Sequence, residues 1–447
     1  MQDTIFALAT APGRAAVAVI RVSGPQSAHL LERLGGRLPA PRRAAVRRLY
    51  RDQDVLDEAL VLWLPGPGSF TGEDSAELHL HGGQATVEAV SKALADLGLR
   101  LAEPGEFSRR AFQNGKLDLT QAEAIADLVD AETDSQRRQA LGQLEGELSA
   151  RYQAWRQRLI EALARLEAAV DFPDEDLPEA LDLQIGGKIA ALAEDLETAL
   201  ADEHRGERVR EGYRIALIGA PNAGKSSLLN RLAGREAAIV TDRPGTTRDV
   251  IEVPAIIGGF RALYADMAGI RETDDPIELE GVRRARAWAK SADLRLWVVD
   301  GSGGSAAGSE AGAMLARGDL VVLNKADRAV GPAVDTAMKA AQREGAGVVR
   351  TSALSDQGVR DLVEAIAGKV RSLGASDDFP AVTRLRHRRR LEEAAQALRR
   401  GGVALAQAPE LAAEDLRHAA TALGRIAGRI DPEEVLGEVF SSFCIGK

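Results

Sequence analysis

Residues 219–226, with the sequence GAPNAGKS, have the pattern G-x-x-x-x-G-K-[ST] of a phosphate-binding loop. A short apolar stretch precedes this loop and a helix-forming stretch follows it, which is the context that such a loop requires. Glycine lets the backbone turn its N–H groups toward phosphate oxygens at the start of a helix. We expect Lys225 to reach the β- and γ-phosphates and the Ser226 hydroxyl to bind Mg2+. The alternative, a glycine-rich turn before a helix, is weakened by the motifs that follow.

Two later motifs indicate which nucleotide is bound. Residues 266–269 (DMAG) fit D-x-x-G, in which Asp266 holds Mg2+ through water and the Gly269 N–H contacts the γ-phosphate. Residues 324–327 (NKAD) end a later apolar stretch, and the Asp327 carboxylate can accept hydrogen bonds from the guanine N1–H and exocyclic amine. Residues 351–354 (TSAL) would close over the base. These elements, in this order and at strand ends, predict guanine-nucleotide binding.

The segment between the first two motifs has the composition of a switch loop. Residues 241–249 (TDRPGTTRD) combine glycine, proline and hydroxyls, which suit a segment ordered by the nucleotide and its metal. Either Thr246 or Thr247 would supply the second hydroxyl to Mg2+.

The residue after DMAG is Ile270, where Ras-type enzymes place a glutamine that orients water. Isoleucine cannot position a nucleophile, so another residue must do so. A monovalent cation held by the Asn222 side chain and by carbonyls around residues 241–246 could supply the charge that the transition state needs. Arg248 and Arg271 are alternatives, and the residue types do not choose among them.

Composition limits the class of protein. The length of 447 residues suits about three domains. A net charge of -10 argues against nonspecific coating of nucleic acid, although a local basic patch could still bind RNA. The single cysteine, Cys444, excludes an internal disulfide and fits a reducing compartment. No apolar run approaches the length of a membrane span and six scattered histidines do not suggest zinc, so we expect a cytoplasmic protein without a membrane partner.

The composition and the spacing of apolar residues change along the chain, and these changes predict a multidomain α/β plus α fold. Residues 1–118 suggest a mixed α+β domain, and residues 119–210 and 376–447 suggest two parts of one discontinuous helical domain. Residues 211–375 alternate strands and helices, as in a Ras-like P-loop GTPase domain inserted into the helical one. The strands expected in that domain are residues 215–218, 250–257, 261–265, 294–300, 320–324 and 347–351.

The chain resembles a known family along essentially its whole length. The motifs of residues 236–242 (EAAIVTD), 245–249 (GTTRD) and 440–447 (FSSFCIGK) are similar to those of the MnmE family, also called TrmE, of bacterial tRNA-modification GTPases. Residues 104–107 (PGEF) and 114–119 (NGKLDL) are similar as well. Three polar segments of the N-terminal region lie at residues 21–25, within residues 70–83 and within residues 104–118. From their residue types alone they would be turns with surface charges; the resemblance makes them a candidate site.

The resemblance implies a potassium-stimulated GTPase whose nucleotide domains dimerise across their active sites. On that pattern Asn222, Thr241, Arg243 and Thr246 hold K+, and Ser226 and Thr247 hold Mg2+. Glu278 would orient the attacking water, so that Glu278, Asn222 and Lys225 are the catalytic candidates. Met267 and the Arg243–Pro244 pair depart from the family's usual residues. The full set of candidate GTP-binding residues is Asn222, Ala223, Gly224, Lys225, Ser226, Ser227, Thr241, Thr246, Thr247, Asp266, Gly269, Asn324, Lys325, Asp327, Ser352 and Ala353.

The resemblance also implies that the N-terminal domain, residues 1–118, binds a tetrahydrofolate derivative (5-formyl or 5,10-methylene) and forms a homodimer. The matching positions are Arg21, Glu77, Lys116 and the terminal Lys447. A carboxylate suits the amidine-like edge of a pterin, and cations suit the carboxylates of folate. Cys444 is either a reactive thiol or a small packing residue beside the pocket.

The partner implied by the resemblance is the FAD-containing MnmG protein, in a heterotetramer. Together they would install an aminomethyl or carboxymethylaminomethyl group on C5 of the wobble uridine of certain tRNAs. The arginine-dense residues 384–390 could contact tRNA phosphates or form a solvated helix start. The alternative function is a regulatory or ribosome-assembly GTPase switch without modification chemistry, which would need no folate pocket.

Overall fold

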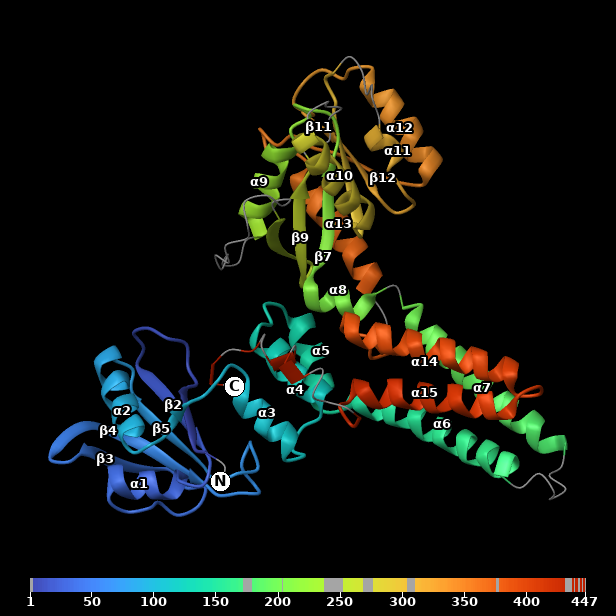
Figure 1. Cartoon of the computed structure of the whole chain (residues 1–447). Coiled ribbons are helices and arrows are strands. Elements are labelled where there is room, and N and C mark those ends of the chain that lie inside the picture. The colour runs from blue at the N-terminus through green and yellow to red at the C-terminus, as the bar shows by residue number, and fades with distance from the viewer. Residues whose placement is uncertain are drawn as a thin grey trace. The chain divides into compact units, whose positions relative to one another are not determined.

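The computed structural model describes residues 3–171, 179–202, 204–236, 252–267, 276–303, 310–374 and 378–430, and residues 436, 437, 439, 440, 443, 445 and 446 near the C-terminus. By internal contacts the chain divides into two compact units. The first comprises Met1–Asp130, Ala140–Thr198 and Arg386–Lys447, and the second comprises Ala131–Gln139 and Ala199–Leu385. Most of the second unit is therefore one insertion in the sequence of the first (Figure 1). In the described part of the chain, no helix is long and apolar enough to cross a membrane.

A six-stranded sheet with the order β3-β4-β5-β2-β1-β6 forms the N-terminal block of the first unit. The strands are β1 (Ile5–Leu8), β2 (Val17–Ser23), β3 (Ala45–Arg51), β4 (Asp54–Leu64), β5 (Ser75–His81) and β6 (Arg100–Leu101). Helices α1 (Ser27–Gly35) and α2 (Gln84–Asp96) share a core with buried strand residues such as Ile20 and Leu78. Because side chains alternate along a strand, Arg21 and Glu77, which are paired in register, lie together on the other face.

Helix α3 (Glu106–Gln113) is fixed to this block by a buried network of charges. Arg110 is only 7% exposed and donates to Glu106, Glu73 and Asp3. Glu106 also accepts hydrogen bonds from Arg100 at 2.7 Å and from the Glu103 N–H at 2.8 Å. Burial of Glu106 acts to raise its pKa, but these hydrogen bonds outweigh burial and lower it. The network therefore depends on Glu106 being ionised.

Long helices form the rest of the first unit: α4 (Leu119–Val129), α6 (Glu147–Asp171), α7 (Glu179–Leu200), α14 (Leu385–Ala404) and α15 (Pro409–Ile426). Helix α5 (Asp134–Leu144) has residues in both units. Along α6 the buried residues Leu148, Tyr152, Trp155, Leu159, Ala162 and Leu166 recur every three or four positions. This spacing gives one apolar stripe, and α6 packs along α15.

Glu123, Arg386 and His387 join the two sequence-distant parts of the helical region, and we call these three buried or partly buried side chains the Glu123 cluster. Glu123 on α4 accepts a hydrogen bond from Arg386 Nη2 at 2.8 Å, and His387 Nε2 lies 3.0 Å from the same carboxylate oxygen. Burial works against the charge of Arg386, but the Glu123 carboxylate more than compensates and raises the Arg386 pKa. The pairing spans 263 residues of sequence and so closes the discontinuous unit.

The second unit contains another six-stranded sheet, with the order β12-β11-β10-β7-β9-β8. Its strands are β7 (Tyr213–Ile218), β8 (Glu252–Ile257), β9 (Phe260–Asp266), β10 (Leu294–Asp300), β11 (Leu320–Asn324) and β12 (Gly347–Arg350). All neighbouring pairs are parallel except β8 with β9. The parallel strands therefore end at one common edge of the sheet, where ligands bind in open α/β sheets.

Helices cover both faces of this sheet. Helices α9 (Lys225–Glu236) and α13 (Val359–Gly374) pack on one face through residues such as Leu228 and Ile366. Helices α10 (Pro276–Ser291) and α12 (Ala333–Glu344) pack on the other through Ala289 and Ala337. The remaining helices are α8 (Arg205–Glu211) and α11 (Glu310–Ala313). This three-layer arrangement is the P-loop α/β architecture predicted from the sequence.

The strands expected between residues 215 and 351 are all observed, within a few residues at their ends, although residues 250 and 251 lie outside the described residues. The exception to a wholly parallel sheet is the β8–β9 hairpin, whose turn is Gly258–Gly259. Both glycines have positive φ, a conformation that glycine adopts without steric cost. The domain boundaries at residues 118, 210 and 375 stay predictions.

Candidate nucleotide site

The phosphate-binding loop connects β7 to α9 and has backbone positions that only glycine fits. Gly219 has φ +142°, and a Cβ there would lie 2.2 Å from the Val298 carbonyl oxygen. Gly224 has φ +92°, and a Cβ there would lie 2.3 Å from Asn324 Nδ2. Asn222 also has positive φ, at 62°, a conformation that asparagine tolerates better than most residues, and its side chain is exposed. The loop therefore packs directly against β10 and against the last residue of β11.

Lys225 lies inside the curve of this loop. Its side chain is buried, and Nζ donates hydrogen bonds to the carbonyl oxygens of Gly219 at 2.9 Å and of Ala220 at 3.0 Å. These bonds hold a positive charge at the first turn of α9, where helix N–H groups also favour an anion. Ser226 and Ser227 follow on α9 and are exposed. The sequence-predicted phosphate contacts thus come together in one loop.

Ser226 and Asp266 are the residues of the predicted Mg2+ site that the structure describes. The Ser226 hydroxyl donates to Asp266 Oδ2. The other carboxylate oxygen of Asp266 is buried and has no hydrogen-bond partner among the described residues. A buried carboxylate oxygen without a partner is costly unless a cation or water satisfies it. This hard-oxygen donor pair therefore fits Mg2+.

Asn324 links the phosphate loop to the base-binding side. It is 1% exposed, donates from Nδ2 to the Ala223 carbonyl oxygen at 2.8 Å, and accepts at Oδ1 from the Ala353 N–H at 3.2 Å. Asp327 accepts a hydrogen bond from the Ser352 hydroxyl, which lowers the Asp327 pKa and keeps the carboxylate ionised. The residues predicted to bind phosphate and guanine therefore belong to one hydrogen-bonded group.

Two residues at this edge were not among the sequence-based candidates. Asp300, the last residue of β10, pairs with Lys325 at 2.6 Å and accepts from the Ser302 hydroxyl at 2.7 Å. Burial acts to raise the Asp300 pKa, but the hydrogen bonds from Lys325 and Ser302 lower it. Arg231 on α9 donates to the Ala353 carbonyl oxygen at 3.0 Å. The position of Asp300 at a parallel strand end beside NKAD was the signal that could have identified it.

Several candidates cannot be placed. Glu278 lies on α10, but its side chain is outside the described residues, as are the rivals Arg248 and Arg271. The other candidates outside the described residues are Thr241, Arg243, Thr246, Thr247, Gly269, Cys444 and Lys447. The proposed K+ ligands are therefore represented only by Asn222.

In the N-terminal block the structure brings Arg21 and Glu77 into direct contact. Arg21 Nη2 lies 3.3 Å from Glu77 Oε1, and the Arg21 guanidinium lies 5.3 Å from the ring centre of Phe70 and 5.9 Å from that of Phe107. Lys116 Nζ donates to the Pro67 carbonyl oxygen at 3.0 Å, in the same loop as Phe70. Arg21, Glu77, Phe70 and Phe107 thus form a partly buried cluster of charged and aromatic side chains.

The described part of the C-terminal tail packs on this block. Phe440 and Phe443 join Leu119 in a small hydrophobic core. A Cβ at Gly446 would lie 2.4 Å from the Leu8 carbonyl oxygen, and Leu8 pairs with Ile20, the neighbour of Arg21 on β2. Gly446 therefore packs against β1, the strand that pairs with the strand carrying Arg21.

The arginine-dense stretch at the start of α14 is less available than its sequence suggests. Arg386 belongs to the Glu123 cluster, Arg388 is 7% exposed, and Arg390 pairs with Glu393 at 2.8 Å. Only Arg389 has an exposed side chain among the arginines from 386 to 390. Most of this stretch stabilises the helical unit.

Comparisons with known proteins cover the whole chain. A family model described as GTP-binding protein TrmE N-terminus matches residues 4–116, and one described as MnmE helical domain matches residues 119–444. Proteins named tRNA modification GTPase MnmE are 58% identical over 449 residues in Phenylobacterium zucineum and 59% identical over 450 residues in Caulobacter vibrioides, with 100% of each chain covered. The corresponding protein of Rhodospirillum rubrum is 52% identical over 462 residues, covering 100% of this chain and 99% of its own.

The fold and the loops at its strand ends define a P-loop GTPase of several domains. The full-length identities and the two matching family models then make the assignment specific. The chain belongs to the MnmE family of tRNA modification GTPases. The resemblance inferred from its motifs is confirmed.

Proposed function

We propose that this protein hydrolyses GTP and that hydrolysis serves modification of tRNA at the wobble uridine, in the cytoplasm and together with an FAD-containing MnmG partner. The observation that carries the nucleotide assignment is the hydrogen bonding of Asn324 to both the phosphate loop and the base-binding loop. Because one buried side chain fixes both ends of the site, phosphate and guanine are recognised together. The alternative of a ribosome-assembly switch is less favoured, because family similarity extends over both flanking regions as well as the nucleotide domain.

In this proposal Ser226 and Thr247 bind Mg2+, with Asp266 acting through a bound water. Mg2+ neutralises charge on the β- and γ-phosphates during transfer. The Asn222 amide, with Thr241, Arg243 and Thr246, holds K+ close to the phosphates. The exposed Asn222 side chain on the phosphate loop supports this assignment, since a side-chain carbonyl oxygen is a suitable ligand for a hard cation. Turnover should be faster in potassium than in sodium buffers.

Glu278 would orient the attacking water in place of the residue missing at Ile270. Replacing Glu278 with alanine should leave the Kd for GDP within about twofold and lower kcat by roughly 100-fold, as expected for loss of a group that positions or deprotonates water. The matched control is Glu280→Ala, two residues along the same helix and therefore on a different face. Single-turnover hydrolysis measures the chemical step. Equal rates for wild type and Glu278→Ala would eliminate this role.

The cluster of Arg21, Glu77, Phe70 and Phe107 supports a folate site. Aromatic rings can stack on a flat pterin, and a carboxylate can pair with its amidine-like edge. On binding, Glu77 would exchange its bond to Arg21 for the pterin, which would release Arg21 for a ligand carboxylate. A site of this kind would be used to deliver a one-carbon unit, with FAD on the partner for redox chemistry.

Calorimetry with 5-formyltetrahydrofolate tests this site on the full-length protein. Glu77→Gln should weaken binding at least tenfold, because a charge-assisted hydrogen bond contributes about 1.5–3 kcal/mol. The control is Glu58→Gln, which removes a carboxylate from an exposed pair with Arg48 on the same sheet. Equal affinity of Glu77→Gln and wild type would remove Glu77 from the site.

The homodimer belongs to the same proposal. Gel filtration with light scattering should give twice the mass of the 47.5 kDa chain without nucleotide. Loss of the wobble-uridine modification from tRNA in cells lacking the protein is the overall test, and unchanged tRNA nucleosides would overturn the assignment to tRNA modification.

A further inference from the structure

An unusual run of arginines occurs in the N-terminal block. Residues 33–51 contain seven arginines and no aspartate or glutamate. The run covers the end of α1, the segment that follows it, and β3, which is an edge strand of the sheet. We use the name arginine patch for five of these residues: Arg33, Arg37, Arg42, Arg43 and Arg47. Arg47 is partly buried and the other four are exposed.

Local contacts bring the patch together on one surface. Helix α1 packs against β3. Arg47 on β3 donates from Nε to the Arg37 carbonyl oxygen at 3.3 Å and from Nη1 to the Val46 carbonyl oxygen at 2.9 Å. The Arg42 N–H donates to the Trp63 carbonyl oxygen at 2.8 Å, which fixes the segment before β3 onto the end of β4. The patch is therefore attached to the sheet through the Arg47 side chain and the Arg42 backbone N–H, and its other four side chains, Arg33, Arg37, Arg42 and Arg43, are exposed.

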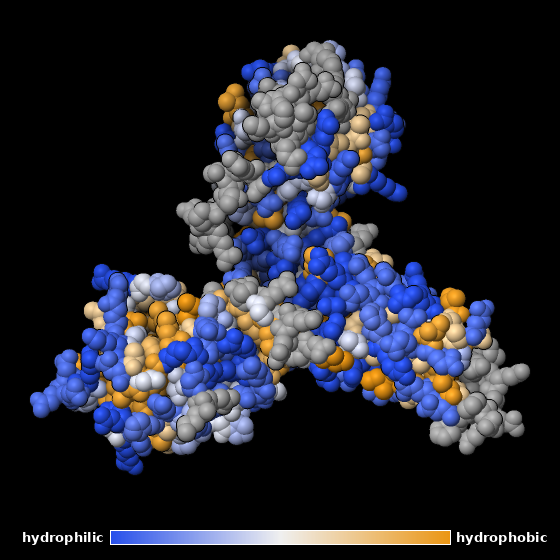
Figure 2. Space-filling model, viewed as in Figure 1, coloured by the Kyte–Doolittle hydropathy of each residue, from blue (hydrophilic) through white to orange (hydrophobic). Residues whose placement is uncertain are grey.

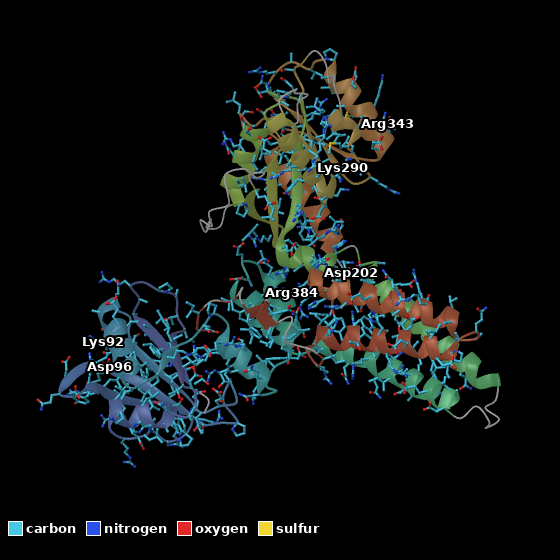
Figure 3. All side chains as sticks on the ribbon, in the orientation of Figure 1. Lys92, Asp96, Asp202, Lys290, Arg343 and Arg384 are labelled. Atoms are coloured by element: carbon cyan, nitrogen blue, oxygen red, sulfur yellow. The ribbon has the colours of Figure 1, made fainter. Side chains whose placement is uncertain are left out.

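The two remaining arginines of the run differ from the patch because they have carboxylate partners. Arg48 pairs with Glu58 on β4 at 2.9 Å, and Arg51 pairs with Asp96 at the end of α2, which Figure 3 labels. No patch arginine has an ion pair with a carboxylate in the described part of the chain. The fold thus neutralises the two arginines outside the patch and leaves five positive charges uncompensated.

The patch lies in a part of the chain that has no excess of basic residues as a whole. Residues 1–118 contain equal numbers of basic and acidic residues, so the net charge of -10 resides in the rest of the chain. Hydrophilic side chains cover much of the face that Figure 2 shows. Protein surfaces usually intersperse charges of both signs. Five neighbouring guanidiniums repel one another, and this repulsion is relieved by a polyanion. Because arginine binds phosphate oxygens through two parallel N–H donors, a phosphate chain is the complementary surface.

We propose that the arginine patch binds the sugar-phosphate backbone of tRNA. This inference rests on the proposed function in tRNA modification and adds the surface that holds the substrate. A net-negative protein cannot attract RNA over its whole surface, so a local patch must supply the contact. Contacts of this type position the RNA and carry no sequence information. The patch is thus predicted to determine affinity and salt dependence while the modification site selects the base.

The test measures binding of a fluorescently labelled, unmodified tRNA transcript to the full-length protein over a range of salt concentrations. The variants are Arg42→Gln with Arg43→Gln, and Arg37→Gln with Arg47→Gln. The matched control is Arg48→Gln with Arg51→Gln, which changes net charge equally in the same arginine run but removes arginines that already have carboxylate partners. Each patch variant should raise Kd about tenfold near 0.1 M salt and reduce the slope of log K against log salt by about 1.5.

The control variant should stay within about twofold of wild type. The GTPase rate and the melting temperature should be unchanged in all variants, because no patch residue belongs to the nucleotide site. If a variant has a lowered melting temperature, the corresponding Arg→Lys variant replaces it. That variant keeps the positive charge and should retain tRNA binding. The proposed role of the patch would be overturned if the patch and control variants weakened tRNA binding equally, or if the patch variants bound tRNA with wild-type affinity. Reduced self-association with unchanged RNA binding would assign it instead to a protein interface. Absence of tRNA binding by the wild-type protein in low salt would overturn the proposed function with it.

Discussion

Replacing Asp300 with asparagine is expected to weaken guanine-nucleotide binding, although Asp300 is not in any of the recognised GTPase motifs. Its Oδ2 lies 2.6 Å from Lys325 Nζ, and its Oδ1 accepts from the Ser302 N–H at 3.0 Å and hydroxyl at 2.7 Å. Lys325 follows Asn324 with φ +61°, so its backbone aims the side chain and the Asp300 carboxylate then fixes it. Asparagine is isosteric and can still accept from Ser302, so the variant removes mainly the ion pair.

The size of the effect follows from the exposure of the pair. The side chains are 25% and 30% exposed, so an effective dielectric constant near 20 applies and gives about 4 kcal/mol of attraction at a charge separation of 4 Å. Immobilising the lysine costs about 1.5–2 kcal/mol, and partial desolvation removes more, which leaves about 1–2 kcal/mol. If the nucleotide requires Lys325 in this position, the Kd for GDP should rise about 5- to 30-fold.

Displacement of a fluorescent GDP analogue measures this Kd. Ser302→Ala is the control, since it removes a hydroxyl from the turn and leaves the ion pair, and it should change Kd less than Asp300→Asn. A double-mutant cycle with Lys325→Met should show that Asp300→Asn has little further effect once the lysine is absent. Additive effects of the two substitutions, or a wild-type Kd for Asp300→Asn, would refute the argument.

Two further predictions concern charge at other sites. Asp327→Asn should lower affinity for GDP at least about 100-fold and raise affinity for XDP, because the asparagine amide matches the carbonyl at C2 of xanthine. Competition between GDP and XDP measures this change. A variant that still preferred GDP would contradict the role of Asp327. The pKa of Glu106 is below its ordinary value of 4.5 in the folded protein, so its contribution to stability is present above about pH 4.5 and is lost as pH falls through the folded-state pKa. Hydrogen exchange of α3 peptides should therefore accelerate in wild type as the pH falls below about 4.5, after correction for intrinsic rates. Glu106→Gln should be less protected at pH 6 by about 3 kcal/mol and less dependent on pH. Equal pH dependence of the two proteins would show that Glu106 does not carry the effect.

The nucleotide domain could be predicted well because its signals are local. The phosphate loop and NKAD each specify a turn at a strand end through a few adjacent residues, and the strand ranges inferred from apolar runs agree with the structure. Asp300 was missed because its partner, Lys325, lies 25 residues away on the next parallel strand end. Because parallel strands end at one edge of a sheet, the sequence could suggest that Asp300 and Lys325 lie close together, but it could not give the geometry of their ion pair.

The N-terminal cluster needed information that sequence spacing does not contain. Arg21 and Glu77 are separated by 56 residues, and their contact depends on the register of β2 with β5. A shift of one residue would place either side chain in the core instead. The arginine-dense stretch illustrates the same limit, because the burial of Arg386 depends on a carboxylate from a helix 263 residues earlier.

The Glu123 cluster has a consequence for the order of events during synthesis on the ribosome. Glu123 and the apolar stripe of α6 emerge long before α14 and α15, the helices that satisfy them. The inserted nucleotide unit lies between them in sequence, so its sheet can be completed while the preceding helices still lack their partners. Nascent chains that stall before Arg386 should therefore present exposed helices beside a folded nucleotide unit, and the last sixty or so residues finish a unit that the first residues began.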